Sequence, residues 1–213
     1  MNRIKDVLYL KDIAYSKIKD LIIRDQLKGP ISENELATLL NMSRTPIREA
    51  LHKLENDNFV EIYPKRGIYI KEITVNDAND LMDVRLAIEL FSIMTISDRF
   101  SDADLHFLED KIREQELAEK NGEVFEFIKA DLEFHEYLLN VAGNQYFVKT
   151  LNNVSDRLFH HGMKTFKRDM TRIQSSINDH KIILEHLKNR DFDKVKSSME
   201  QHIEKGKKDY LLT

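Results

Sequence analysis

The chain has 213 residues and a formal net charge of −4, and 41% of its residues are hydrophobic while 33% are charged. This is the composition of a globular protein that is long enough for one large or two modest domains. The sequence contains no Cys, which excludes disulfides, Cys-ligated zinc fingers and thiol nucleophiles. Only 6 Gly and 3 Pro in a chain of this length favour long helices over a many-stranded sheet.

The sequence gives no sign of a membrane segment. No apolar run approaches the roughly 20 residues that a spanning helix needs, and the first residues lack the apolar core and cleavage site of a signal peptide. We therefore expect a cytoplasmic protein without membrane contact. Basic residues slightly outnumber acidic ones in residues 1–72, whereas acidic residues predominate in residues 73–213. Such a distribution is compatible with DNA contact at one end of the chain and a different task at the other.

Two helices are predicted ahead of residue 41. After about ten residues of uncertain order, a stripe of apolar side chains predicts a helix from Lys11 to Leu27, which the sequence Lys28-Gly29-Pro30 ends. Ser32 and Glu35 then form the S-x-x-E pattern of a capping box and start a second helix over residues 33–40. A turn of two residues leads from there into a third helix.

The third helix, SRTPIREALHKLE at residues 43–55, combines a defined start with one apolar and one basic face. Ser43 suits the N-cap, and Pro46 falls in the first turn, where no backbone N–H is needed. At or near the first turn, the face opposite the apolar stripe carries Arg44, Thr45 and Arg48. Arg in this position can bind guanine or phosphate in a major groove. For this stretch alone, an ordinary amphipathic helix with solvated arginines is the better interpretation. Two short helices joined by so short a turn are nevertheless typical of a helix-turn-helix.

A hairpin is predicted directly after this helix. Apolar residues alternate on either side of residues 64–67, namely Val60, Ile62, Ile68 and Ile70. The tip, Pro64-Lys65-Arg66-Gly67, offers two cations and a glycine that can approach a phosphate backbone or a minor groove closely. A basic hairpin tip is usually only a turn, but its position behind a helix-turn-helix favours a winged-helix domain.

Residues 33–70 have the sequence ENELATLLNMSRTPIREALHKLENDNFVEIYPKRGIYI. This stretch is similar to the signature of the winged-helix domain of GntR-type transcription regulators. The resemblance implies groove and phosphate contacts in the third helix and contacts of the wing in the hairpin, made by Arg44, Thr45, Arg48, Arg66 and Gly67. One departure concerns the entry to the second helix, where relatives usually show G-x-R-L-S-E. Pro30 stands where an Arg is common, which puts one DNA contact in doubt.

Beyond a linker at residues 73–77, the sequence predicts six further helices and hardly a strand. Their breaks are marked by Ser101, Asn121-Gly122, Gly143-Asn144 and Asp191. The helices are placed at residues 78–98, 102–119, 123–141, 144–167, 169–188 and 192–208. The expected fold is therefore mainly α, with an N-terminal winged helix-turn-helix at residues 1–72 and a C-terminal six-helix all-α bundle at residues 78–213.

Four polar residues interrupt the apolar stripes of these helices. Asp131 and His135 are four apart on one apolar face, and His180 and His202 continue apolar stripes of their own helices. A single His on such a face is more often an ordinary core residue. Burying four polar groups would cost roughly several kcal/mol each without compensation, and a shared metal ion would compensate all of them. This N3O set suits Zn²⁺, Ni²⁺, Mn²⁺ or Fe²⁺, and spacing does not choose between them.

The second half of the chain resembles the all-helical ligand-binding domain of the FadR subfamily of the same regulators, in its metal-binding, VanR-like version. The resemblance lies in DLEFHEYLL, INDHKIILEHL and SSMEQHIEKG, which contain the four candidate ligands. It implies a homodimer that binds palindromic operator DNA, and a small carboxylate effector that reaches the metal. Arg85, in LMDVRLAIEL, is a candidate for binding that carboxylate, and an ion pair with Glu89 one turn on is an equally good alternative.

The sequence thus predicts a dimeric transcription regulator, not an enzyme, that responds to a small organic acid. A metal-dependent enzyme is the alternative from another class, because open positions on a metal also activate water. No motif supplies a general base beside the ligands, and an enzyme would not need a complete DNA-reading module. A sensor of the metal itself is a third hypothesis with the same fold, in which removal of the metal alone would change DNA affinity.

Overall fold

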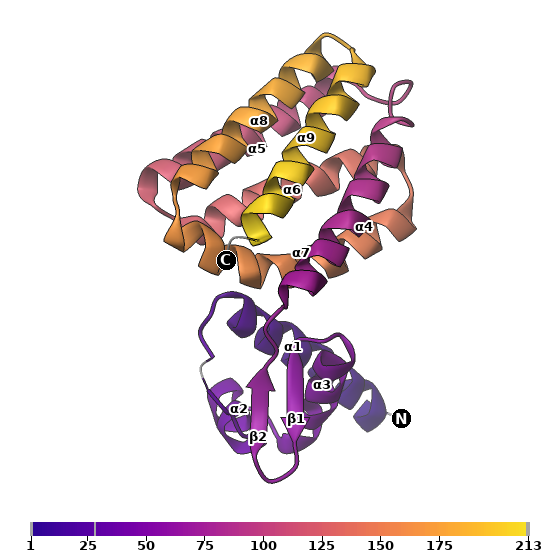
Figure 1. Cartoon of the computed structure of the whole chain (residues 1–213). Coiled ribbons are helices and arrows are strands. Elements are labelled where there is room, and N and C mark those ends of the chain that lie inside the picture. Colours follow the sequence, from indigo (N-terminus) through magenta and orange to yellow (C-terminus); the bar gives the residue numbers. More distant parts are fainter. Residues whose placement is uncertain (1, 28, 212–213) are drawn as a thin grey trace. The chain divides into compact units, whose positions relative to one another are not determined.

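A computed structural model describes residues 2–27 and 29–211 of the chain. The chain divides into two compact units, Met1–Glu72 and Ile73–Thr213 (Figure 1). None of the described helices is both long and apolar enough to cross a bilayer.

The first unit contains a helix-turn-helix followed by a two-stranded antiparallel hairpin, as predicted. Its elements are α1 (Asn2–Ile23), α2 (Glu33–Leu40), α3 (Arg44–Asn56), β1 (Val60–Tyr63) and β2 (Gly67–Ile70). Val60 pairs with Ile70 and Ile62 with Ile68, so the alternating apolar residues face one another across the hairpin. The winged-helix prediction is confirmed for the elements that the structure describes.

The core of this unit lies between α1 and α3. Their buried side chains include Ala14, Ile18, Ile47, Leu51 and Leu54. They lie three or four residues apart along each helix, so each helix turns one stripe inward. The other face of α3 consequently remains exposed.

The capping residues behave differently at the two short helices. The predicted capping box is present at α2, where the Glu35 backbone N–H donates to Ser32 Oγ at 3.2 Å and the Ser32 N–H donates to the Glu35 carboxylate at 2.7 Å. Ser43 occupies the N-cap position of α3, but its side chain makes no capping hydrogen bond.

The predicted limits of the first helix were wrong at both ends. The helix begins at Asn2 rather than Lys11 and ends at Ile23 rather than Leu27. Asp25 has φ 58°, and the Gln26 N–H donates to the Leu21 carbonyl at 2.9 Å. A left-handed residue with such a hydrogen bond closes a helix. Lys28, part of the predicted stop, lies outside the described residues.

The segment after α1 pairs with the wing. Ile31 and Ile68 exchange two backbone hydrogen bonds of 2.8 Å and form an isolated antiparallel bridge. Pro30 therefore leads directly into a residue that is hydrogen-bonded to the hairpin. The hairpin is held on one side by this short extended segment.

The second unit consists of six described helices, as predicted. They are α4 (Val75–Ile93), α5 (Asp102–Asn121), α6 (Val124–Ala142), α7 (Gln145–Arg168), α8 (Thr171–Lys188) and α9 (Phe192–Leu211). The limits of α5 to α9 lie within about three residues of the predicted ones. Left-handed glycines at residues 122 and 143 end α5 and α6, which is why these breaks were visible in the sequence.

The limits of α4 differ from the predicted ones by three residues at its start and by five at its end. The helix begins at Val75, inside the predicted linker, because Thr74 and Asp77 form a capping box with backbone bonds of 3.1 and 3.2 Å. It ends at Ile93 instead of residue 98. There the Thr95 hydroxyl donates to the Ser92 carbonyl at 2.8 Å, which gives the backbone an alternative to a further helical turn.

Five of the six helices surround one interior. α4 contacts α6, α6 contacts α5, α5 contacts α8, α8 contacts α9, and α9 returns to α4, while α7 packs against α4, α6 and α9. Large apolar side chains such as Phe127 and Phe134 of α6 fill much of the interior. Polar side chains from all five helices also enter it, and they gather in one cluster.

Candidate metal centre and DNA-contacting surface

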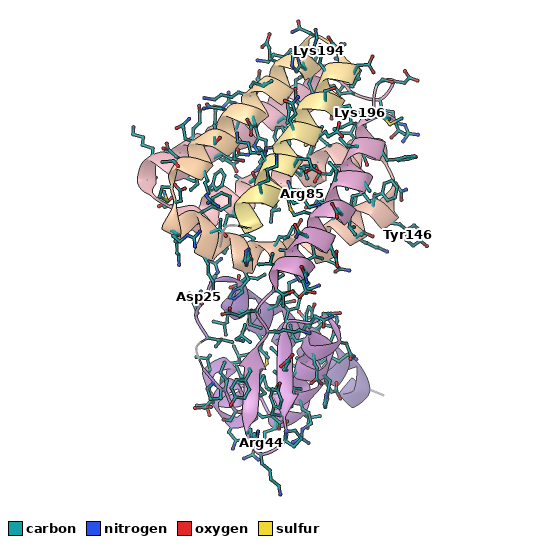
Figure 2. The ribbon with its side chains drawn as sticks, viewed as in Figure 1. Asp25, Arg44, Arg85, Tyr146, Lys194 and Lys196 are labelled. Carbon is teal, nitrogen blue, oxygen red and sulfur yellow. The ribbon has the colours of Figure 1, made fainter. Side chains whose placement is uncertain are left out.

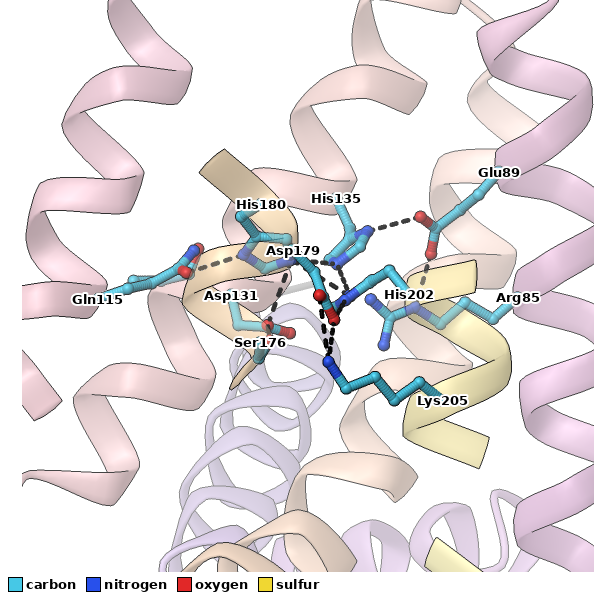
Figure 3. Close-up of polar contacts among 11 residues, drawn as sticks. Arg85, Glu89, Gln115, Asp131, His135, Ser176, Asp179, His180, His202 and Lys205 are labelled. Carbon is cyan, nitrogen blue, oxygen red and sulfur yellow. Dashed lines mark hydrogen bonds and ion pairs between the residues drawn. The ribbon is translucent and has the colours of Figure 1, made fainter. Parts of the chain in front are cut away.

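The four predicted ligands lie together inside the ring of helices (Figure 3). Asp131 and His135 come from α6, His180 from α8 and His202 from α9, and their ligand atoms lie within 4.8 Å of one another. The three Nε2 atoms form a nearly equilateral triangle, with 3.1 Å between His135 and His180 and 3.2 Å from His202 to each. Asp131 Oδ1 lies 3.6 Å from His180 Nε2.

The second ring nitrogen of each imidazole faces an acceptor. The Nδ1 pairs are His135 with Glu89 at 2.6 Å, His180 with Gln115 at 2.8 Å, and His202 with Asp179 at 3.5 Å. Carboxylate and amide oxygens only accept, so Nδ1 carries the proton in His135 and His180 and donates it to Glu89 and Gln115. In a neutral imidazole this leaves the Nε2 lone pair free to bind a cation.

Burial keeps two of these imidazoles neutral. Burial and the nearby Arg85 lower the pKa of His135, against the opposing effect of Glu89. Burial and the two neighbouring imidazoles lower the pKa of His180 well below its usual value. Burial alone would raise the pKa of Glu89, but His135 and Arg85 bring it down to about 2, so this carboxylate is ionised.

The separations between the three imidazole Nε2 atoms fit a divalent metal ion. At metal–nitrogen distances of about 2.0 to 2.1 Å, two nitrogens lie about 2.9 Å apart at a right angle and about 3.3 Å apart in a tetrahedron. The observed separations of 3.1 and 3.2 Å fall in this interval. Three convergent lone pairs repel one another unless a cation lies among them, so the donor set itself favours a bound ion.

Arg85 is buried beside this cluster and forms an ion pair with Glu89, which was the predicted alternative to a role in effector binding. Its Nε donates to Glu89 Oε1 at 2.6 Å, while the other oxygen of Glu89 accepts from His135. Arg85 also lines a cavity of about 50 Å³, whose wall includes Asp131 and His202. The cavity therefore reaches the candidate ligands, and apolar residues of α4 and α6 form part of its wall, among them Met82 and Ile128.

The predicted DNA-contacting residues of α3 lie on its exposed face. Arg44, Thr45 and Arg48 are all exposed, and Arg44 projects away from the unit (Figure 2). Arg48 also pairs with Glu33 of α2, with its Nε 2.9 Å from Oε1 and its Nη2 2.7 Å from Oε2. The sequence did not suggest this pair, because an acidic residue in the first turn of a helix already has an explanation in the helix dipole.

The backbone conformation at the tip of the wing favours glycine at residue 67. Arg66 is exposed, and Gly67 has φ +104°. A Cβ at this position would lie 3.2 Å from the Ile31 carbonyl oxygen and 3.4 Å from Pro30 Cβ. Both the backbone angle and this close approach favour glycine, so Gly67 has a structural reason to be there.

Both units match known families over most of their length. Residues 10–70 match the bacterial regulatory proteins of the gntR family, and residues 80–205 match the FCD domain. The chain belongs to the GntR family of transcription regulators. Its second unit is the FCD domain, and the protein is a DNA-binding transcription regulator.

Individual GntR relatives align with most of the chain. The uncharacterized HTH-type transcriptional regulator YdhC of Bacillus subtilis (strain 168) is 28% identical over 192 residues, which cover 89% of this chain and 84% of YdhC. The HTH-type transcriptional repressor RspR of Escherichia coli (strain K12) is 27% identical over 175 residues, 82% of this chain and 76% of RspR. The solved structure of E. coli McbR/YncC has the same fold, with a TM-score of 0.80 at 18% identity over 92% of this chain and 94% of that one.

The sequence patterns of this GntR regulator did not identify the residues that face the second ring nitrogen of each histidine. These residues are Glu89, Gln115 and Asp179. Gln115 had a detectable signal, because it is buried in the stripe that also contains Leu108 and Ile112 of α5. A polar residue in such a stripe needs a buried partner. Glu89 was considered only as a partner of Arg85, and nothing in the sequence marked Asp179.

Proposed function

We propose that operator affinity is controlled by a small carboxylate that binds beside a divalent metal ion in the helical unit. The observation that carries this proposal is the triangle of Nε2 atoms, 3.1 to 3.2 Å apart, whose partner nitrogens all face acceptors. Asp131, His135, His180 and His202 would hold the ion. When bound, it would supply positive charge and open coordination positions for oxygen atoms of a ligand.

The donor set narrows the choice of metal without fixing it. Three imidazoles and one carboxylate suit Zn²⁺, Ni²⁺, Mn²⁺ or Fe²⁺. Ca²⁺ and Mg²⁺ are disfavoured, since both prefer oxygen ligands. Glu89 and Gln115 orient the rings of His135 and His180 through hydrogen bonds, and Asp179 lies 3.5 Å from His202 Nδ1, so the site would be largely organised before an ion arrives.

The cavity beside the ligands is the proposed effector site. At about 50 Å³ it has room for only a few non-hydrogen atoms in this conformation, which fits a small organic acid. Arg85 lines it with a guanidinium group, a natural partner for a carboxylate. Because its Nε is bonded to Glu89, Arg85 would meet the effector through its terminal nitrogens.

In the first unit, the proposed DNA contacts are those of an exposed helix face and a basic turn. Arg44, Thr45 and Arg48 would enter the major groove, and the wing with Arg66 and Gly67 would follow the adjacent backbone or minor groove. The protein would act on the chromosome in the cytoplasm.

We infer that the regulator is a homodimer on a palindromic operator, since two-fold symmetry of a protein matches repeated half-sites. The helical unit leaves large apolar side chains exposed on α4, at its C-cap and at the start of α7: Val84, Phe91, Met94 and Tyr146. Phe91 lies against Phe147 with ring centroids 5.6 Å apart, so the two helices form one surface there. A second copy would cover this apolar surface.

Metal analysis and ligand binding test the proposal together. The purified protein should contain about one equivalent of metal per chain, and a thermal-shift screen of small organic acids should find a ligand only for the metal-loaded protein. Arg85→Ala should weaken that ligand while metal content stays near normal. Equal affinity for the ligand after removal of the metal would contradict the proposal.

The same experiment addresses the two other hypotheses. If the protein senses the metal itself, a chelator alone should change operator affinity and no organic acid should be needed. If the metal centre is catalytic, the organic acid should be consumed during incubation, which chromatography of the mixture would detect.

A further inference from the structure

An ion pair connects the two helices of the helix-turn-helix at its exposed face. Glu33 is the first residue of α2, and Arg48 lies in the second turn of α3. Both oxygens of the carboxylate are used, with Oε1 2.9 Å from Nε and Oε2 2.7 Å from Nη2. The Arg48 side chain nevertheless remains 60% exposed, so the pair leaves most of it accessible to a binding partner.

The geometry of this ion pair determines which N–H donors of the Arg48 guanidinium remain available to DNA. The group has five N–H donors in one plane. Glu33 occupies the edge formed by Nε and Nη2, and three donors remain on Nη1 and the outer side of Nη2. Two of these form the end of the fork, which matches the O6 and N7 acceptors that guanine presents in the major groove.

The Glu33 carboxylate also changes which group of the DNA Arg48 binds favourably. A phosphate attracts the net charge of a cation, and a carboxylate at 2.7 Å offsets much of that charge. A guanine edge instead requires two donors in a fixed orientation. Because Glu33 holds the side chain in one conformation before DNA binds, less conformational entropy is lost on binding.

We propose that Glu33 is a positioning residue that holds Arg48 for reading one guanine in each operator half-site. This inference rests on the proposed role of Arg48 in the major groove. It assigns a specificity function to a residue of α2 that need not touch a base, and it makes Arg48 a base-reading residue rather than a phosphate contact.

Selection of binding sites from a pool of random double-stranded DNA tests the proposal. The wild type, Glu33→Gln, Arg48→Ala and Glu49→Gln should be compared on the selected site, on its single-base variants and on an unrelated duplex of equal length. Glu49→Gln is the matched control, because it removes one negative charge from an exposed position of α3. Melting temperatures report whether each variant is folded.

In Glu33→Gln, discrimination for one guanine per half-site should fall about tenfold, which is within the range for one bidentate contact. Arg48→Ala should lose the preference at the same position, and Glu49→Gln should keep it. If Glu33→Gln binds all duplexes more tightly with discrimination unchanged, Glu33 only competes with DNA and the proposal is overturned. Unchanged binding and discrimination in Glu33→Gln would overturn it as well.

The Arg48→Ala variant separates failure of the positioning role from failure of the contact. If Arg48→Ala loses the guanine preference and Glu33→Gln keeps it, Arg48 reads DNA without help from Glu33. If Arg48→Ala selects the same sequence as the wild type, the proposed contact of Arg48 is itself wrong.

Discussion

The two units place their functional side chains in opposite environments. Around α3 the candidate DNA-contacting residues are exposed, and their positions depend on one helix face and one turn. In the helical unit His135 and His180 are completely buried, and their positions depend on residues from several helices. Substitution at the surface should therefore change binding with little effect on stability, whereas substitution inside the ring should change both together.

The largest effect is expected for His180→Ala, which removes the imidazole bonded to Gln115 and in contact with both other histidines. Metal content should fall far below one equivalent, and the free energy of unfolding should drop by on the order of 3 kcal/mol, because a cavity and an unpaired amide remain. Elemental analysis and urea denaturation measure the two quantities. His186→Ala, on the same helix but outside the cluster, should leave both nearly unchanged. Full metal content in His180→Ala would show that the cluster does not bind the ion.

At the surface, Arg48→Ala should weaken specific operator binding about 100-fold while the melting temperature stays the same. One lost bidentate contact reduces affinity on the order of tenfold per half-site, and a symmetric dimer loses it twice. Fluorescence anisotropy with operator DNA measures the affinity, and near-ultraviolet circular dichroism checks the fold. A variant that binds normally would refute the assignment of α3 as the recognition helix.

An intermediate effect is expected for Gln115→Leu, because this residue orients His180 without being a candidate ligand. Loss of such a partner typically lowers metal affinity about 10- to 100-fold. Competition with a coloured chelator measures the affinity. Gln174→Leu, at an exposed position of α8, is the control. Equal chelator competition in both variants would mean that the amide has no part in holding the ring.

The smallest effect is expected for Arg66→Ala in the wing. The loss should be similar for operator and unrelated DNA, and the slope of log affinity against log salt should become shallower by about one. Titrations at several salt concentrations provide this slope. A loss confined to one base pair of the operator would indicate instead that Arg66 reads a base directly.

Local sequence patterns predicted most of the fold because the decisive signals lie within a few residues of one another. The break at Gly122 and the capping box at Ser32 each involve a single turn of chain. The end of α1 at a left-handed Asp25 and the start of α4 at Thr74 were missed. An Asp can adopt that conformation but rarely requires it, and a capping box made by Thr and Asp departs from the commoner pattern with Glu or Gln at its third position.

For the site, the sequence predicted which side chains face the interior but not which residues they meet there. The spacing of Asp131 and His135 on one face of α6 follows from helical periodicity alone. Their contacts with residues of other helices depend on how the helices pack, which no spacing encodes. For the same reason the pairing of Glu33 with Arg48, across the turn between two helices, became visible only in three dimensions.

Glu89 gives the two proposed binding events a shared carboxylate. One of its oxygens lies 2.6 Å from Arg85 and the other 2.6 Å from His135, so a ligand that moves Arg85 acts on the same group that holds one of the candidate metal ligands. Thermodynamic linkage is reciprocal: if the ion strengthens binding of the organic acid, the acid must strengthen retention of the ion by the same factor. Transfer of metal to a chelator at equilibrium thus becomes a way to identify the effector without knowing the operator, since the right acid would be the one that lowers the fraction of metal transferred.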